Sequence, residues 1–223
     1  MSVAFFDFDK TLIRRNSARL WVQTELRLGN VSLATALRAT ALLMRYRLGS
    51  ANLETGILSA IASLKGELET DVRERVQEFY RKIVRQHYRP RGLDRVRGHQ
   101  DAGDSVVLLT SASQYLAEAV QIDLGLTDIL CNRFEVDAEG RFTGKPAGAL
   151  CFGDGKRTLA QEWLKERSYQ NARTLFYTDS FSDVPFLAAV DHPVAVNPDP
   201  RLARLARKRG WKVEDWNGSR RRG

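Results

Sequence analysis

The sequence predicts an α/β fold, with a doubly wound parallel sheet as its core and an all-helical unit inserted into that core. Two observations support this prediction. Short apolar runs recur along the chain, and each is followed by polar side chains and then by a helical pattern. After the first run, a stretch of roughly seventy residues has helical periodicity and no strand signal. The 223 residues, of which 43% are hydrophobic, are enough for one large core and a small inserted unit.

The first apolar run, at residues 3–6, predicts a strand that is buried on both faces of a parallel sheet. Asp7 and Asp9 follow it directly, and ligand sites in such sheets lie at the carboxyl ends of the strands. Two carboxylates that converge there repel each other unless a cation lies between them. The alternative is a strand that ends in a polar loop, with Asp9 capping a helix that begins near Thr11.

The inserted unit comes next in the chain. Gly-containing breaks separate the predicted helices, which lie at residues 17–28, 32–48, 52–64 and 70–87. The stretch at 33–48 is apolar on more than one face, so we interpret it as a central helix packed on its neighbours; a helix in weak contact with a membrane surface is the alternative. The expected domains are a core of residues 1–13 and 91–216, the helical unit of residues 14–90, and a basic, disordered tail of residues 217–223.

A second strand, at residues 105–110, also ends in polar groups. It finishes at Thr110 and continues through Ser111 and Ala112 into a helix. A hydroxyl and backbone amides at the start of a helix suit the oxygens of a phosphate. Ordinary helix capping produces the same pattern and is the alternative.

Two further segments add an ammonium group and two carboxylates. The strand at residues 174–177 is followed by Asp179 and Asp183, four residues apart. Lys156 stands at the start of a helix predicted at residues 157–167. A lysine there is unusual because the helix dipole favours anions, so a place beside phosphate and carboxylates would account for it. A solvated lysine is the alternative.

The remaining pattern completes the core. Residues 129–136 and 141–143 flank a turn sequence and predict a hairpin. The last core strand is predicted at residues 194–197, and a final helix at residues 199–209.

The chain carries a net charge of +8, and the charge is uneven. Residues 201–223 hold nine basic and two acidic side chains, a net charge of +7, which we interpret as a solvated helix and an Arg-rich end. No interleaved aromatics or recognition motif indicate a specific nucleic-acid partner. Cys131 and Cys151 form no CxxC pair, and neither a signal peptide nor a transmembrane segment is predicted, so we expect reduced thiols and a cytoplasmic location.

Taken in order, the polar residues resemble the motifs of the haloacid dehalogenase-like superfamily of phosphohydrolases, in its phosphoserine-phosphatase-like branch. The residues that match its four motifs are Asp7-Phe8-Asp9-Lys10-Thr11 (DxDxT), Thr110, Lys156, and Asp179 with Asp183. The resemblance implies a Rossmann-like core. It also implies that residues 14–90 form a cap that closes over the active site and selects the substrate.

The resemblance further implies a Mg²⁺-dependent phosphomonoesterase that acts on a small phosphorylated metabolite. Asp7 would be the nucleophile that becomes an aspartyl phosphate. Asp9 would be general acid and then general base, and its backbone carbonyl would bind Mg²⁺ together with the carboxylates of Asp7 and Asp179. Asp183 would hold a metal-bound water or the ammonium of Lys156. Thr110 and Lys156 would be the other two catalytic residues. The phosphate-binding residues would be Thr11, Thr110, Ser111, Ala112 and Lys156.

One position departs from the phosphoserine phosphatases. In that branch, a Glu nine residues after the nucleophile binds the amine of serine, whereas this chain has Asn16 there, preceded by Arg14 and Arg15. We therefore expect another small phosphomonoester, such as histidinol phosphate or a lysophospholipid-type phosphate, with Arg14 and Asn16 as candidate selectivity residues. A phosphotransferase or mutase on the same scaffold and a non-catalytic basic binding protein are the alternatives.

Overall fold

A computed structural model describes residues 2–29 and 53–218. Its core is a six-stranded parallel sheet with the strand order β3-β2-β1-β6-β7-β8. Counted along the chain within the sheet, this is the order 3-2-1-4-5-6 of a doubly wound, Rossmann-like fold, so the predicted fold class is confirmed. The strands are β1 (Ser2–Phe6), β2 (Ser105–Ser113), β3 (Asp128–Asn132), β6 (Arg173–Thr178), β7 (His192–Val196) and β8 (Lys212–Glu214).

The central strand, β1, lies between β2 and β6, at the point where the strand order reverses. Phe6 at its end is opposite Leu108 of β2 and Tyr177 of β6. Asp7 is the next residue, and its backbone N–H donates to the carbonyl of Tyr177 at 2.9 Å. In doubly wound sheets the crevice at this reversal is where ligands bind. Asp7 therefore enters the place in the fold that is best suited to a binding site.

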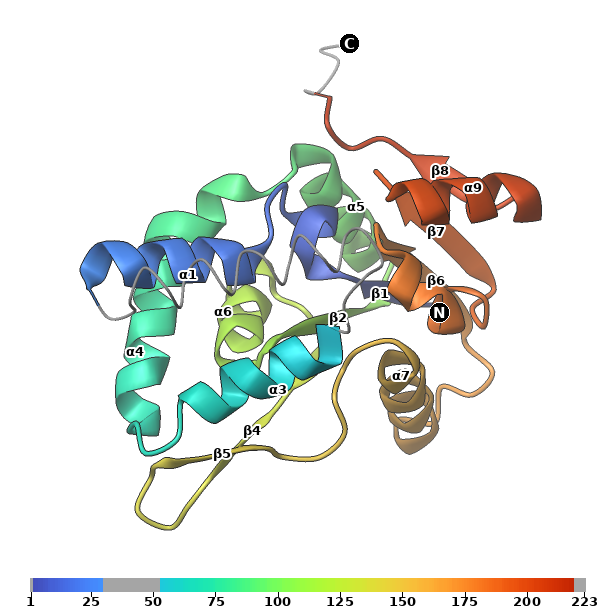
Figure 1. Ribbon diagram of the computed structural model, residues 1–223. Coiled ribbons are helices and arrows are strands. Elements are labelled where there is room, and N and C mark those ends of the chain that lie inside the picture. Colours follow the sequence, from blue (N-terminus) through green and yellow to red (C-terminus); the bar gives the residue numbers. More distant parts are fainter. Residues whose placement is uncertain (1, 30–52, 219–223) are drawn as a thin grey trace.

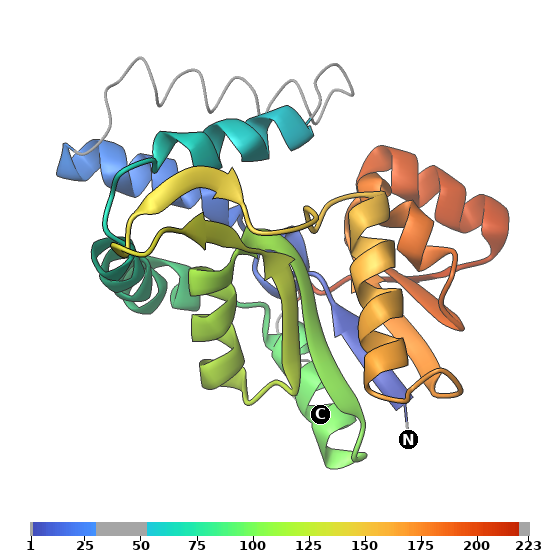
Figure 2. The same ribbon diagram turned by 90° about the horizontal axis from the view of Figure 1, so that it is seen from below.

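The side chains of the sheet alternate between two hydrophobic layers. Ala4 and Phe6 of β1 pack with residues of α5 and α6, whereas Val3 and Phe5 pack with residues of α7, α8 and α9. Figure 2 shows α6 and α7 on opposite sides of the sheet. Helices on both faces account for the continuous apolar runs in the strand sequences. The helices are α5 (Pro90–Asp101), α6 (Gln114–Leu124), α7 (Asp154–Glu166), α8 (Val184–Leu187) and α9 (Pro200–Arg209).

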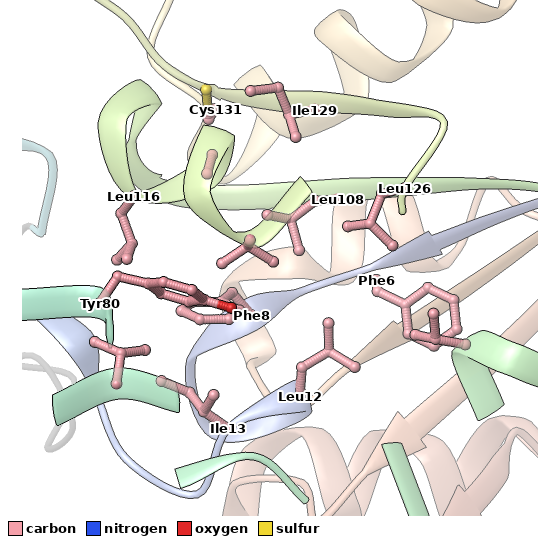
Figure 3. Packing of buried hydrophobic residues seen from close by; sticks show 14 of the residues in the cluster. Phe6, Phe8, Leu12, Ile13, Tyr80, Leu108, Leu116, Leu126, Ile129 and Cys131 are labelled. Carbon is pink, nitrogen blue, oxygen red and sulfur yellow. The ribbon is translucent and has the colours of Figure 1, made fainter. Parts of the chain in front are cut away.

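The segment that follows β1 is anchored in the first of these layers. Phe8, Leu12 and Ile13 are fully buried and belong to one cluster. In Figure 3, Phe8 lies beside the ring of Tyr80, with Leu12 and Ile13 below it and Leu108 of β2 above it. Phe8 stands between the two acids of the first motif, so its burial fixes the backbone from which both carboxylates project.

The described part of the inserted unit consists mainly of helices joined by short turns. It contains α1 (Ser17–Leu28), α3 (Leu53–Ser63) and α4 (Glu69–Phe79), and α4 continues as two short helical turns, Tyr80–Val84 and Arg85–His87. The helix predicted at residues 32–48, with its membrane-surface alternative, lies outside the described residues. The two linkers run side by side, since Ile13 and Tyr88 form an antiparallel bridge. Figure 1 places α1, α3 and α4 together, beyond one edge of the sheet.

The hairpin at residues 134–146 differs from its prediction. It consists of β4 (Phe134–Val136) and β5 (Phe142–Pro146), whereas residues 129–132, which the sequence predicts as part of its first arm, belong to β3 of the main sheet. The segment predicted as one strand, residues 129–136, thus contributes to two strands in different sheets. The hairpin packs against α3 and the turn after it, where the Gly66 N–H donates to the Phe142 carbonyl at 2.9 Å. It therefore joins the inserted unit to the core.

The C-terminal end of the sheet was also incompletely predicted. The structure adds β8 after the strand that the sequence indicates as the last one. β8 has three residues, Lys-Val-Glu, and Val213 is 50% exposed, so it lacks the apolar run that signals a buried strand. Asn217, assigned to a disordered tail, accepts a hydrogen bond from the buried Arg89. Residues 219–223 of that tail lie outside the described part of the chain.

Neither described part of the chain contains a helix long and apolar enough to cross a bilayer. The cytoplasmic location stays a prediction. Cys131 and Cys151 are buried and form no disulfide, as expected.

Candidate active site

A buried ammonium group joins two of the predicted acids. Lys156 Nζ donates to Asp7 Oδ1 at 2.7 Å and to Asp183 Oδ2 at 2.9 Å. Lys156 is 2% exposed, and it lies in the first turn of α7, which begins three residues earlier than predicted. The same oxygen of Asp183 accepts a hydrogen bond from the hydroxyl of Thr178 at 2.6 Å. Side chains 149 residues apart in the chain thus meet at the carboxyl edge of the sheet.

Thr11 links the first motif to the fourth. Its hydroxyl donates to Asp7 Oδ2 at 3.3 Å and accepts from the backbone N–H of Asp179 at 3.0 Å. Thr11 is fully buried, so these bonds use its hydroxyl inside the protein. They place the carboxylates of Asp7 and Asp179 in one cluster. Among the described residues, we find no hydrogen-bond donor to the carboxylate of Asp179.

Asp9 is held by the start of the first helix of the inserted unit. Its carboxylate accepts from the Ser17 N–H at 2.7 Å, the Ser17 hydroxyl at 3.0 Å and the Asn16 amide at 3.2 Å. The Asn16 carbonyl oxygen caps α1 by accepting from the Arg19 N–H at 2.9 Å. Both ends of the Asn16 side chain are therefore occupied. Its observed contacts orient Asp9 and begin a helix.

Burial and repulsion raise the pKa values of the acids. Burial raises the pKa of Asp7 to about 6, even though the charge of Lys156 opposes this shift. Burial, followed by the charge of Asp7, raises the pKa of Asp179 well above its ordinary value. Burial alone would lower the pKa of Lys156, but the charges of Asp183 and Asp7 outweigh it and raise that pKa. The cluster thus holds more negative charge than its buried cation offsets.

The chemistry of the cluster fits a small divalent cation. No three His, Cys, Asp or Glu side chains of the described chain are grouped to hold a metal, so a cation here would need other ligands as well. Mg²⁺ binds through one or two carboxylates, carbonyl oxygens and retained waters. The carboxylates of Asp7 and Asp179 and the carbonyl of Asp9 offer such a set, and the excess charge would favour ionic binding. The residues therefore fit the metal that the first motif implies.

The second predicted motif lies where β2 leaves its regular pairing. Thr110 is buried, and its hydroxyl accepts from the Ala112 N–H at 3.1 Å. The hydroxyl of Ser111 donates to the carbonyl of Cys151 at 2.7 Å. The Ala112 amide and the Ser111 hydroxyl therefore serve the local loop in this structure. Among the residues proposed for phosphate, Thr110 and Ser111 lie directly after the regular part of β2.

Arg89, a residue that the sequence did not indicate, supports the loop directly after the two acids of the first motif. It donates to the carbonyl of Lys10 at 3.2 Å and also to Asn217, and it is 5% exposed. Lys10 has a positive φ of 58°, a conformation that is uncommon outside glycine. Arg14, a candidate selectivity residue, is exposed, and its charge adds to burial in lowering the pKa of Arg89. The positive charge of Arg14, in the first linker of the inserted unit, therefore lies near Arg89.

The fold and the site together define a phosphohydrolase-like α/β protein, and comparison with known proteins gives the family. The family model described as "haloacid dehalogenase-like hydrolase" matches residues 4–188. The chain belongs to this family, as its motifs predicted.

Two relatives of this chain are named as phosphatases. The chain is 32% identical over 216 residues to a histidinol-phosphatase of Neisseria meningitidis, covering 95% of this chain and 97% of that protein. It is 30% identical to a phosphoserine phosphatase of Mycobacterium tuberculosis, covering 98% of this chain and 72% of that protein. A crystal structure of a Bordetella pertussis protein of unknown function is 31% identical, with a TM-score of 0.86, and 96% of this chain and 98% of that chain are covered. The chain is thus a haloacid dehalogenase-like phosphatase.

Proposed function

We propose that this protein is a Mg²⁺-dependent phosphomonoesterase that acts through an aspartyl phosphate on Asp7. One observation carries the proposal: the carboxylate of Asp7 lies 2.7 Å from the buried ammonium of Lys156. A carboxylate can attack a phosphate dianion only where the negative charge is offset. Lys156 offsets part of it, and Asp183 and Thr178 hold Lys156 in place.

The other residues divide the remaining tasks. Asp7, Asp179 and the carbonyl of Asp9 would hold Mg²⁺, which supplies further positive charge to the phosphoryl oxygens when bound. Thr110 and the loop after it lie at the edge of the sheet where those oxygens would bind. Thr11 fixes Asp7 against Asp179. Positioning and charge stabilisation of this kind provide most of the catalysis in phosphoryl transfer.

Asp9 is suited to move the proton. It would protonate the leaving alkoxide and then take a proton from the attacking water, which requires a pKa above the ordinary value of a carboxyl. Burial raises the pKa of Asp9, although the hydrogen bonds from Ser17 oppose the shift. Because these bonds come from the start of α1, the position of the helical unit would also set the orientation of Asp9.

We propose that residues 14–90 act as the cap that selects the substrate, with residues 1–13 and 91–216 as the catalytic core. The antiparallel linkers at Ile13 and Tyr88 support this division. Among small phosphomonoesters, histidinol phosphate is the first to test, because the relative that matches along nearly its whole length is named a histidinol-phosphatase. Asn16 lacks the carboxylate that the phosphoserine-phosphatase-like motif would place there, so phosphoserine ranks second.

Removal of the metal tests the proposed chemistry. We expect EDTA to abolish hydrolysis of an aryl phosphate, and excess Mg²⁺ to restore it, because two buried carboxylates with raised pKa values remain uncompensated without a cation. A panel that includes histidinol phosphate, phosphoserine and a lysophospholipid-type phosphate, assayed with Mg²⁺, then identifies the substrate class by kcat/KM. Hydrolysis of the aryl phosphate that survives complete chelation would contradict the metal-dependent mechanism.

The stabilising effect of Mg²⁺ should depend on pH. A carboxyl with a pKa raised from 3.8 to about 6 binds its proton more tightly in the folded chain, so the metal-free protein loses stability as pH rises through this range. Mg²⁺ needs the ionised carboxylates and should therefore raise the thermal midpoint strongly at about pH 8 and weakly at about pH 5. Asp179→Asn should remove most of the effect at the higher pH. An equal shift at both pH values would contradict a site built on Asp7.

A further inference from the structure

The strands β2 and β3 separate at the second motif. Their pairing is regular as far as Leu109 opposite Leu130, and it resumes at Ser113 opposite Asn132. Three residues of β2, 110–112, thus lie opposite the single residue Cys131. Such a bulge releases backbone groups from the ladder and leaves them in need of other partners. At this point the chain offers its proposed phosphate-binding residues.

The side chain of Asn132 fills the gap. Its amide donates to the carbonyl of Ser111 at 2.7 Å, and its carbonyl oxygen accepts from the backbone N–H of Cys151 at 2.7 Å. The hydroxyl of Ser111 closes the ring by donating to the carbonyl of Cys151, also at 2.7 Å. Asn132 is 1% exposed and Cys151 is fully buried, so these bonds have little competition from water.

Cys151 is in turn close to the helix that carries Lys156. The loop after Cys151 turns tightly into α7, with the Gly155 N–H donating to the carbonyl of Phe152 at 2.9 Å and the Lys156 N–H donating to the carbonyl of Gly153 at 3.2 Å. A Cβ at Gly155 would lie 2.0 Å from the carbonyl oxygen of Leu150. The first turn of α7 is therefore packed directly on the loop that Asn132 holds.

We propose that Asn132 is a positioning residue that holds the loop of Thr110 and Ser111 in fixed register with the helix of Lys156. This inference rests on the proposed phosphatase function. Lys156 and the loop after β2 must contact the same phosphoryl group, yet they come from segments without pairing to each other in the sheet. The carboxamide of Asn132 joins them because it has one donor and one acceptor on the same short side chain. Asn132 would act through these two segments, since its side chain bonds to the backbone of Ser111 and Cys151.

The test compares two amide-to-leucine substitutions, one at Asn132 at the end of β3 and one at Gln100 on α5. Asn132→Leu removes the two hydrogen bonds that the Asn132 side chain makes in the ring. Gln100→Leu is the matched control, since its amide donates to the carbonyls of Leu124 and Gly125 at 2.8 and 3.0 Å, at the opposite end of α6. Aryl-phosphate hydrolysis with Mg²⁺ is measured well below the thermal midpoint of each variant, together with inhibition by inorganic phosphate.

We expect Asn132→Leu to lower kcat/KM by about tenfold to a hundredfold, as small misplacements of catalytic groups do, and to weaken inhibition by phosphate. Gln100→Leu should lower the thermal midpoint while kcat/KM and phosphate inhibition stay close to wild type. A purely structural role for Asn132 predicts that the two variants behave alike. The proposal is overturned if kcat/KM of folded Asn132→Leu lies within about twofold of that of Gln100→Leu.

Asn132→Asp provides a second measurement and serves alone if the leucine variant does not fold. The aspartate keeps the acceptor for the Cys151 N–H, but it regains a donor for the Ser111 carbonyl only when it is protonated. Its kcat/KM, divided by that of wild type at each pH, should therefore rise as pH falls, and a ratio that is flat or falls overturns the proposal. Asp7→Asn in the same assay separates the two hypotheses, because activity surviving in that variant would refute the phosphatase mechanism itself.

Discussion

Asp7→Asn is expected to lower the turnover of an aryl phosphate by about 10⁴-fold or more, the scale seen when an enzyme loses its nucleophile. The amide is close to the carboxylate in size and shape, but it cannot attack phosphorus. An aspartyl phosphate therefore cannot form. The amide also accepts a weaker hydrogen bond from Lys156 than the charged carboxylate, so the ammonium is less firmly held at this position.

The loss should not come from unfolding. Burial raises the pKa of Asp7 to about 6, so its ionised form is unfavourable in the metal-free protein at neutral pH. A neutral amide removes the repulsion between this position and Asp179, whose pKa the charge of Asp7 helps to raise. Lys156 keeps its second partner, Asp183. We therefore expect the metal-free variant to have a thermal midpoint at neutral pH no lower than that of wild type.

Acid quenching during turnover gives the direct measurement. Peptides of the wild-type protein should contain a phosphoryl group on Asp7, and those of Asp7→Asn should not. Asp101→Asn is a suitable control, since Asp101 is an exposed carboxylate on α5. More than about a tenth of wild-type activity in well-folded Asp7→Asn, a loss of less than 1.4 kcal/mol in transition-state stabilisation, would refute Asp7 as the nucleophile.

The sequence was sufficient for the parts of the site that lie at the ends of buried strands. Apolar runs marked β1, β2 and β6, and the polar residues after them are brought to one edge because parallel strands share a direction. The Nζ atom of Lys156 lies 2.7 Å from Asp7 Oδ1, at this same edge. At these positions the order of residue types in the sequence is enough to predict which side chains meet, because every strand concerned ends at the same edge.

The sequence was not sufficient where a contact depends on register or on an atypical strand. Asn132 follows an apolar run, yet its role arises from the bulge in β2, and no periodicity in the sequence marks that bulge. Arg89 is buried against Asn217, beyond a strand with one apolar residue in three. Substrate selection by Asn16 stays a prediction, and no pattern in the sequence marks the hydrogen bonds by which Asn16 orients Asp9 and caps α1. Such contacts depend on the local path of the backbone.

Lys156→Met is expected to lower both activity and stability. The methionine fills a similar volume, but two carboxylates, Asp7 and Asp183, lose the cation that lies within 3 Å of each. Removing one partner of a buried ion pair costs about 3–5 kcal/mol, because the remaining charge stays buried without compensation. Activity should fall for the same reason, since the negative charges of the nucleophile and the phosphoryl group are no longer offset. Lys145→Met, at an exposed position on β5, is the matched control.

The loss of stability in Lys156→Met should depend on pH, and this dependence identifies its cause. The charge of Lys156 lowers the pKa of Asp7, so without it burial raises that pKa further above about 6. A carboxyl whose pKa is raised on folding destabilises the protein as pH rises through that pKa. Urea unfolding of the metal-free variant should therefore show a larger deficit against wild type at about pH 8 than at about pH 5. Simple loss of packing would lower the free energy of unfolding equally at both pH values. Uncompensated charge would lower it less at the lower pH, where the carboxyl is protonated.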